Sequence, residues 1–329
     1  MAAVARAVDA APLPPSPPEL ARFTRWVVSG VGASEGPARL LVGQLVELGL
    51  SARFLPVTSF LGADAPTADV LVVVSQRLSP NARIPLRHRA RYRATVLVTS
   101  LDPREDTRAR ALAAEGATIL QHGPPEEEGL ILRVLGPALA SRTVLHLAAT
   151  VAALRGAPPS WTSRTGELGA AIARARDAAV PVDPAWVFGP SAILGAGDAG
   201  ELAPGLRTKL LEALGVAEPP IWDLCGLVHG PLQSFFDGPR LLFVLEASDA
   251  PGGEALRRRL TEVLDPARHR VHVVGATLPS PLCFFEWAAA FDAIVLDALR
   301  ARPRDLADWP GKGRDGPLYG IDGEGDALG

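Results

Sequence analysis

The chain has 329 residues, of which 48% are hydrophobic, with 33 basic and 36 acidic residues and a formal net charge of −3. This length and apolar content are sufficient for a large buried core and exclude global disorder. The near balance of charge argues against a nucleic-acid-binding protein that works through a broad cationic face. The two cysteines do not support a disulfide framework or a cysteine metal site. We therefore expect a cytoplasmic protein without a metal or other cofactor.

No uninterrupted apolar run approaches the roughly 20 residues that a membrane helix needs. The longest apolar stretches, residues 144–154 and 288–299, are interrupted by His146 and by two aspartates. The first 20 residues contain five prolines and lack the continuous apolar core of a secretory signal. The sequence thus predicts that this segment is a loose arm or a strap across a partner, and it predicts no membrane partner.

Short apolar runs alternate with helical segments in the first half of the chain. Most of these runs are continuously hydrophobic, as expected for parallel strands buried on both faces. The helical spacing is carried by residues 36–48 and 106–115. Strands that alternate with helices indicate a doubly wound parallel sheet. The predicted strands are Trp26–Gly30, Ser51–Val57, Val70–Ser75, Thr95–Ser100 and Ala117–Leu120.

The second half of the chain repeats this plan. Its predicted strands, Ala185–Gly189, Arg240–Glu246 and Arg270–Gly275, lie about 160 to 175 residues downstream of the first, third and fourth strands. One large sheet is the alternative, but recurrence in the same order favours two tandem copies. The predicted fold class is therefore α/β, with two doubly wound parallel-sheet domains of three αβα layers. The expected parts are a flexible proline-rich arm (1–20), a first domain (21–155), a linker and connecting helix (156–180), a second domain (181–300) and a C-terminal tail near the site (301–329).

A glycine-containing loop, Gly30–Gly36, follows the first predicted strand and precedes a helix. A dinucleotide-binding loop reads G-x-G-x-x-G and is followed about 20 positions later by an acidic residue for the ribose. The third glycine of this loop comes one position late, and no acidic residue follows the second strand before Asp64. A nicotinamide-dependent oxidoreductase is therefore disfavoured, and Ser34 remains as a contact to an anion or a sugar.

A second polar loop follows the third predicted strand. Ligands in open α/β sheets bind outside the carboxyl ends of strands, where hydroxyls, an amide and backbone N–H groups can hold a phosphate. A nearby guanidinium, from Arg77 or Arg83, would add charge-assisted contacts. The alternative is a turn in which Ser79-Pro80 only caps the next helix. The candidate ligand residues in this loop are Ser75, Gln76, Arg77, Ser79 and Asn81.

Two residues in the second half are candidates for acid–base chemistry. Glu212 lies opposite a leucine face on a predicted helix, and His229 precedes Gly230-Pro231, where a turn would present its ring. Glu212 could instead be a solvated surface residue, or pair with Lys209 one helical turn away. A lone histidine is also more often structural than catalytic.

Taken together, these motifs resemble the sugar isomerase (SIS) domain family. The resemblance rests on the tandem α/β halves, the serine-glutamine loop after the third strand, and K-x-x-E at Lys209–Glu212 followed by H-G-P at His229. The closest pattern is the isomerase half of glucosamine-6-phosphate synthase and its two-domain relatives, including deglycases of amino-sugar phosphates. It covers roughly residues 26–308.

The resemblance implies a role for each matched residue. Ser75, Gln76 and Ser79 fall on the phosphate loop, and Ser34 falls where the first loop approaches the sugar. Glu212 matches the base that moves a proton between C1 and C2. His229 matches the histidine that assists ring opening, often donated across a dimer interface, so a homodimer is expected. Aldose–ketose interconversion needs one poised carboxylate and one group with a near-neutral pKa.

The sequence also departs from the family pattern. The usual loop reads S-Q-S-G-x-(S/T), whereas Arg77-Leu78 follows the serine-glutamine pair. Asp308 stands where the family's tail lysine forms a Schiff base, and Lys312 is the nearest substitute. The second half is expected to open with Gly189-Pro190-Ser191 in place of glycine-arginine-glycine. These departures leave two functions open: a phosphosugar isomerase, deaminase or deglycase, and a non-catalytic protein that binds sugar phosphates through an eroded site.

Overall fold

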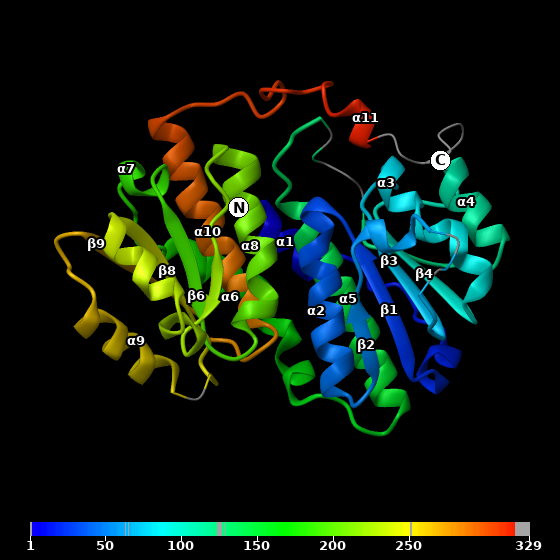
Figure 1. Ribbon diagram of the computed structural model, residues 1–329. Helices are drawn as coiled ribbons and strands as arrows, with labels where there is room; N and C mark the ends of the chain where they lie inside the picture. Colours follow the sequence, from blue (N-terminus) through cyan, green and yellow to red (C-terminus); the bar gives the residue numbers. More distant parts are fainter. Residues whose placement is uncertain are drawn as a thin grey trace. The chain divides into compact units, whose positions relative to one another are not determined.

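The computed structural model describes residues 2–319 except 63, 65, 124–126, 128 and 251, and it divides into two compact units. The first α/β unit contains Ala10–Thr162 and the tail from Ala307. The second α/β unit contains the N-terminal residues up to Asp9 and Ser163–Leu306. Each unit has its own parallel sheet, which confirms the predicted fold class (Figure 1).

The sheet of the first α/β unit has five parallel strands in the order β2-β1-β3-β4-β5. Its central strands are continuous runs of β-branched and aliphatic residues, and every residue of β3 is buried. Burial on both faces is typical of a parallel strand covered by helices. The strands are β1 (Arg25–Gly30), β2 (Ser51–Phe54), β3 (Val70–Val74), β4 (Ala94–Thr99) and β5 (Thr118–Gln121).

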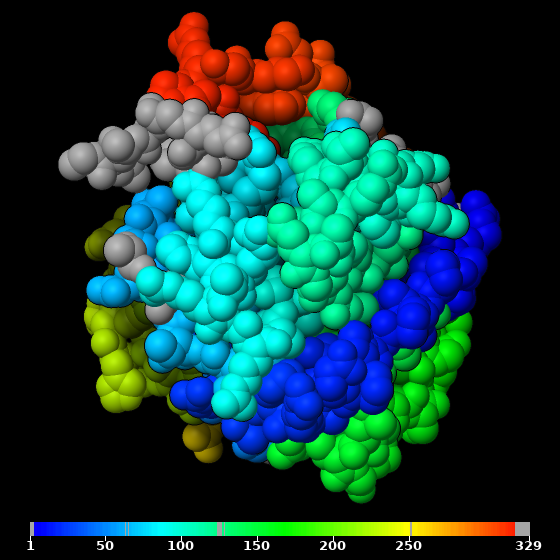
Figure 2. All heavy atoms as spheres, turned by 90° about the vertical axis from the view of Figure 1, so that its right-hand side faces the viewer, coloured from blue at the N-terminus to red at the C-terminus, as the bar shows by residue number. Residues whose placement is uncertain are grey.

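Helices cover both faces of this sheet. Helices α2 (Glu35–Glu47) and α5 (Leu135–Leu154) pack against each other and against the strands. The other face is covered by shorter helices, whose side chains form a core with Leu71, Val73 and Leu97. Residues 80–120, light blue to blue-green in Figure 2, form much of the surface on this side. The remaining helices are η1 (Pro18–Arg22), η2 (Gly32–Ser34), η3 (Val57–Phe60), α3 (Pro80–Arg83), η4 (Pro85–Arg91), α4 (Thr107–Ala114) and α11 (Gly316–Tyr319), with η5 (Ser160–Glu167) at the junction of the units.

Helix α5 is long and apolar enough to cross a membrane by length and composition alone. Its buried side chains include Leu139, Val144, Leu147 and Val151, and it packs on α2 and η1. It is therefore a core helix of this unit.

The sheet of the second α/β unit repeats the same strand order with one strand fewer, β7-β6-β8-β9. Helices α8 (Ala199–Leu214) and α6 (Leu168–Asp177) pack on α10 (Cys283–Ala301). Phe284, Phe285 and Trp287 of α10 are buried, so this aromatic cluster belongs to the core. The strands are β6 (Ser191–Gly195), β7 (Ile221–Asp223), β8 (Arg240–Glu246) and β9 (His269–Gly275), and the other helices are η6 (Gly226–Val228), η7 (Pro231–Asp237) and α9 (Gly253–Val263).

The strand predicted at 185–189 is wrong. Residues Pro184–Val187 form the short helix α7. Proline at the first helical position and Asp183, whose side chain accepts a hydrogen bond from the Ala185 N–H, start a helical turn there. The first strand of this unit is β6, which begins at Ser191, so the loop that opens the unit is Gly195–Asp198 rather than Gly189–Ser191.

The structure also differs from the sequence expectation at the N-terminus, where the sequence predicted a flexible arm. Ala2–Ala10 form helix α1, with Val4 and Val8 buried. The Asp9 carboxylate accepts a hydrogen bond of 2.9 Å from the N–H of Gly169 in the first turn of α6. Valines one helical turn apart give α1 an apolar stripe, which explains why this segment folds against the second α/β unit.

Candidate functional site

The first α/β unit has its topological switch point between β1 and β3. The chain passes from β1 to β2 on one side and from β3 to β4 on the other, and crevices form at such points outside the carboxyl ends of the strands. Gly30 pairs with Val74 at the ends of these two strands. The loops that contain Ser34 and Ser75 therefore start side by side.

The loop after β1 is compact. The Ser34 N–H donates to the Val31 carbonyl at 3.2 Å, and the Ser34 side chain is buried at the start of α2 without capping that helix. A Cβ atom on Gly30 would lie 2.6 Å from the Ser34 carbonyl oxygen. Gly30 thus permits a close approach of backbone in this structure, which is a sufficient reason for a glycine here without a dinucleotide.

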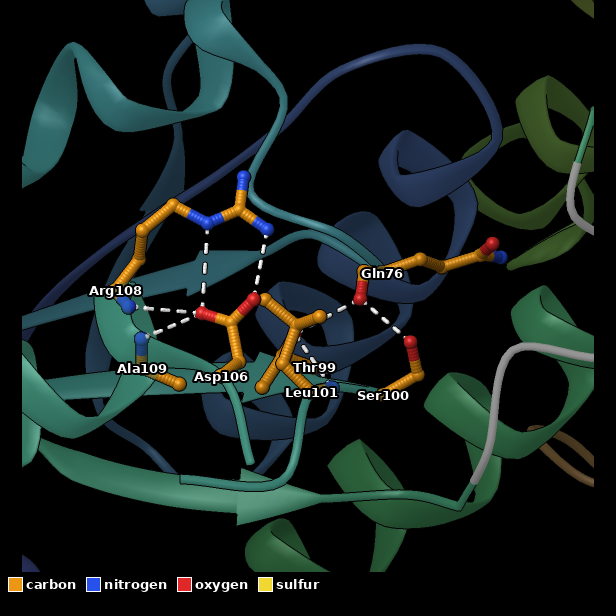
Figure 3. Close-up of polar contacts among 7 residues, drawn as sticks. All are labelled: Gln76, Thr99, Ser100, Leu101, Asp106, Arg108 and Ala109. Atoms are coloured by element: carbon orange, nitrogen blue, oxygen red, sulfur yellow. Dashed lines mark hydrogen bonds and ion pairs between the residues drawn. The ribbon is translucent and has the colours of Figure 1, made fainter. Parts of the chain in front are cut away.

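The loop after β3 is held by its own backbone. The Gln76 carbonyl accepts hydrogen bonds from Thr99 Oγ1 at 2.9 Å and from the hydroxyl and N–H of Ser100 (Figure 3). The preceding residue, Ser75, is buried. Three donors on one carbonyl fix the loop against the end of β4, so the position of the Ser75–Ser79 segment is determined by the fold.

The Gln76 side chain extends away from these contacts, as Figure 3 shows. It lies against Gly136 in the first turn of α5, where a Cβ atom would overlap its amide. The N–H groups of this turn are taken by Glu127, whose carboxylate accepts hydrogen bonds of 2.7 to 3.0 Å from Val134, Leu135 and Gly136. Glu127 therefore caps α5, and the sequence analysis missed it because the contact spans seven to nine residues of irregular chain.

Leu78 occupies an unusual backbone conformation for a leucine, with φ of +50°. The family pattern has glycine at this position, and glycine adopts positive φ without a steric penalty. The Leu78 side chain is fully buried and packs in the same core cluster as Leu71 and Val73. The leucine thus keeps the left-handed turn of the loop, with core packing opposing its backbone strain.

Replacement of Leu78 by alanine or glycine tests this balance. We expect both variants to lose stability because they vacate a buried site, at a cost of about 2–5 kcal/mol. The glycine variant should be about 1 kcal/mol more stable than the alanine variant, since only glycine relieves the positive φ. Urea denaturation measures the difference. Leu86 is buried in the same cluster without positive φ, so its glycine variant should be less stable than its alanine variant. If the glycine variant were the more stable one at both sites, the difference at Leu78 would not come from backbone strain.

The remaining loop residues lead into α3. Ser79 precedes this helix, with Pro80 at its first position, but the Ser79 side chain makes no capping hydrogen bond. Ser79 thus occupies the N-cap position of α3, as the capping alternative predicts, but its hydroxyl does not cap the helix. Arg77 and Asn81 are half-buried. Asn81 Nδ2 donates to the Leu318 carbonyl at 3.0 Å, which brings the described part of the tail to this edge of the first α/β unit.

The tail contains Lys312, the nearest substitute for the family's lysine. Its ammonium donates to the Ala307 carbonyl and lies 5.0 Å from the centre of the Trp309 ring. Both contacts are local to the tail. In this conformation Lys312 is engaged by its own segment, whereas residues 320–329 of the predicted tail lie outside the described residues.

Glu212 and His229 both belong to the second α/β unit, and the topology separates them. Helix α8 starts beyond the carboxyl end of β6 and runs back, so Glu212, in its last turn, lies about 20 Å along the helix towards the amino edge of the sheet. His229 is exposed and follows β7 and η6 at the carboxyl edge. Within one unit these two residues lie at opposite edges of the sheet.

Lys209 is buried rather than part of a surface ion pair. Its ammonium lies 2.5 Å from Asp292 Oδ1 on α10, and both side chains are at least nine-tenths buried. The sequence analysis offered Lys209 only as a surface partner of Glu212. The structure places it between α8 and α10, where it joins the two helices.

The carboxyl edge of the second sheet has a different character. Asp198 and Asp249 lie here beside Ser280, which donates its hydroxyl to Asp198 at 2.6 Å and its N–H to Asp249. Burial, together with these two carboxylates, raises the pKa of the neighbouring Cys283 thiol well above its usual range. Two carboxylates in a crevice of about 120 Å³ repel an anion, so this edge does not offer a second phosphate site.

His122 directly follows β5 and is 1% exposed. Its N–H donates to the Thr99 carbonyl at 2.9 Å, and neither ring nitrogen has a hydrogen-bond partner among the described residues. Burial of the ring, which disfavours the charged imidazolium, lowers the pKa of His122 to about 4. The histidine is therefore neutral in the folded protein near pH 7.

This shift makes stability depend on pH. The unfolded chain, with a histidine pKa near 6.5, binds a proton more readily than the folded one, so the contribution of His122 is complete above about pH 6.5 and is lost as the pH falls towards 4. Between pH 7 and pH 5 the loss amounts to roughly 2 kcal/mol. Urea denaturation of the native protein and of His122→Leu at both pH values measures it. If both proteins lost the same free energy of unfolding between pH 7 and pH 5, the pH dependence would not come from His122.

Comparisons with known proteins agree with the architecture. No family model matches the chain, and no curated protein matches it in sequence. Among solved structures, the C-terminal domain of glucosamine-fructose-6-phosphate aminotransferase from Francisella tularensis is similar, with a TM-score of 0.73 and 12% identity over 92% of this chain and 94% of that chain. The chain has the tandem SIS fold.

Two further tandem SIS structures match over most of their length. Glucosamine-6-phosphate deaminase from Thermotoga maritima has a TM-score of 0.68 and 17% identity, over 89% of this chain and 90% of that chain. Tagatose-6-phosphate ketose/aldose isomerase from Escherichia coli has a TM-score of 0.64 and 16% identity, over 93% and 89%. The predicted resemblance is thus confirmed at the level of the fold.

Proposed function

We propose that this protein binds a sugar phosphate at the carboxyl edge of β1 and β3 and catalyses isomerisation or removal of an amino group through proton transfer between C1 and C2. The observation that carries the proposal is the position of the predicted ligand residues. Ser34, Ser75, Gln76, Arg77 and Ser79 lie in the two loops at the topological switch point of one tandem SIS unit, and Asn81 lies in α3, directly after the second loop. Two of the similar structures are named as a deaminase and an isomerase of phosphorylated hexoses.

In this proposal, the residues that bind the phosphate differ from those that transfer the proton and open the sugar ring. The hydroxyl of the buried residue Ser75, the uncommitted hydroxyl of Ser79 and the Arg77 guanidinium bind the phosphate, which supplies orientation because it is remote from the reacting carbons. Glu212 transfers the proton, and His229 assists ring opening. Since His229 is exposed and lies at the opposite sheet edge from Glu212, we assign it to the site of a second copy in a homodimer.

A second function has its own support. The phosphate loop has Arg77-Leu78 after its serine-glutamine pair, where the family has serine and glycine, and Lys312 is engaged within the tail. A protein that binds sugar phosphates without turning them over would keep the loop and lose the tail lysine. Binding that is detected by calorimetry without any isomerisation in NMR spectra would favour this regulatory role.

A thermal-shift panel of phosphorylated and unphosphorylated hexoses and hexosamines tests the shared part of both functions. A ligand at one hundred times its Kd stabilises the folded state by about 2.7 kcal/mol, which is readily measured as a rise in Tm. We expect hexose 6-phosphates to raise the Tm and the parent sugars not to. Ser75→Ala should reduce the shift at least severalfold, whereas Ser51→Ala, at an exposed position of β2, should not. Absence of any shift with phosphorylated sugars would overturn both functions.

A further inference from the structure

A cavity of about 550 Å³ opens at the carboxyl ends of β1 and β2. Of the residues proposed to bind the sugar phosphate, Asn81 alone lines it. This volume lies in the range of small-molecule sites. All of its walls come from the first α/β unit. Carbon makes up most of the lining, which includes Val31, Phe54, Val57, Leu61, Ile84 and Leu318.

The polar groups of the cavity are few and specific. Asn81 connects it to the phosphate loop: its Nδ2 donates to the Leu318 carbonyl, and its Oδ1 is buried and accepts no hydrogen bond from any described residue. On the α2 side, the Arg39 guanidinium lies 4.3 Å from the centre of the Phe54 ring and 2.7 Å from Glu35 Oε1. Arg39 and Phe54 thus present a stacked pair of planar groups, with the arginine charge balanced by Glu35.

This lining does not suit the sugar itself. Hexose hydroxyls placed against Val31, Leu61 and Ile84 would lose their hydrogen bonds to water without replacement. A planar apolar group would instead bury its carbon surface and stack on the Arg39–Phe54 pair. An adjoining N–H or O–H of the same ligand would supply the donor that Asn81 Oδ1 lacks.

We infer that the natural ligand is a sugar phosphate that carries an aromatic or similarly flat apolar substituent, seated in this cavity and joined to the sugar beside Asn81. The inference rests on the proposed function, since it takes the phosphate to be bound by the Ser75–Ser79 loop. It deepens that function by naming the substrate class: a conjugate rather than a bare hexose phosphate.

Calorimetry with the full chain and two probes tests the inference. The probes are glucosamine 6-phosphate and its N-benzyl derivative, which differ only in the apolar group. We expect the benzyl compound to bind at least tenfold more tightly, as burial of a phenyl ring predicts.

A matched pair of variants assigns the difference to the cavity. Thr58 is an exposed lining residue, and Thr67 is an exposed residue of the same β2–β3 connection outside the cavity. Thr58→Trp should fill the cavity and remove most of the tenfold preference, with little effect on glucosamine 6-phosphate. Thr67→Trp should leave both affinities unchanged.

The outcomes separate the two proposals. Binding of glucosamine 6-phosphate without a preference for its benzyl derivative, or a preference that Thr58→Trp leaves intact, overturns the inference and leaves the proposed function standing. Failure of both probes to bind overturns the proposed function, and with it the conjugate.

Discussion

Replacement of Glu212 by glutamine is expected to lower kcat by about 100- to 10,000-fold on the sugar phosphate that the thermal-shift panel identifies. The amide keeps the size of the side chain but cannot accept the proton that moves between C1 and C2, and general acid–base catalysis contributes this range of rate. Binding of the sugar phosphate should stay within a few fold of the native value, because the phosphate loop is unchanged. Steady-state kinetics gives kcat, and calorimetry gives the affinity.

Glu201→Gln is the control for this variant. Glu201 is an exposed residue in the first turn of the same helix, so its replacement makes the same chemical change on α8 away from Glu212. It should retain nearly native turnover. Full activity of Glu212→Gln would refute the assignment of the base.

A mixing experiment addresses His229. The inactive variants Glu212→Gln and His229→Gln each retain the residue that the other lacks. If the imidazole serves a second copy, a mixed dimer has one complete site, and random pairing restores about a quarter of native activity. Absence of recovery after subunit exchange has been demonstrated would show that the histidine does not act across the dimer.

Replacement of Lys209 by methionine is expected to lower the free energy of unfolding by about 3–5 kcal/mol. The substitution leaves the Asp292 carboxylate buried without its cation, and an uncompensated buried charge has a cost in this range. The double variant Lys209→Met with Asp292→Leu removes both charges and should recover most of the loss. Urea denaturation followed by circular dichroism measures each protein.

An exposed ion pair on α10, the helix that carries Asp292, provides the comparison. Arg300 and Asp297 of α10 are three residues apart, and their side chains are 69% and 40% exposed. Arg300→Met should change the stability by less than about 1 kcal/mol. If Lys209→Met had an equally small effect, the buried pair would not contribute to holding α8 against α10.

The parts of the fold that the sequence predicts are those with a strong local signal. Strands β1, β3 and β4 are continuous apolar runs between turns, and their order recurs in the second half. Strand β6 was missed because Ser191–Gly195 is short and follows a more hydrophobic segment, Trp186–Gly189, that a proline and an aspartate turn into a helix. The candidate site loops could be named from the sequence because they follow strands directly.

The contacts that were missed join residues far apart along the chain. Glu127 caps α5 from an irregular segment, and Lys209 meets Asp292 across 83 positions. The apolar cavity combines residues from the β1 loop, α2, β2, α3 and the tail. Each of these segments has an ordinary local sequence, so only their assembly in three dimensions creates the feature. The proposed roles of Glu212 and His229 rest on the family motif, since no local pattern distinguishes them from surface residues.

Helix α1 has a consequence for biosynthesis. The ribosome delivers it before Gly169, its hydrogen-bonded partner, which is 160 residues further along. Synthesis proceeds at about 5–20 residues per second, so the segment on which α1 packs is made on the order of 10 to 30 seconds after α1. During that interval the intervening α/β unit can already fold. A bulky fusion placed before Ala2 would therefore disturb the folding of the second α/β unit, to which α1 belongs. The first α/β unit would fold as before.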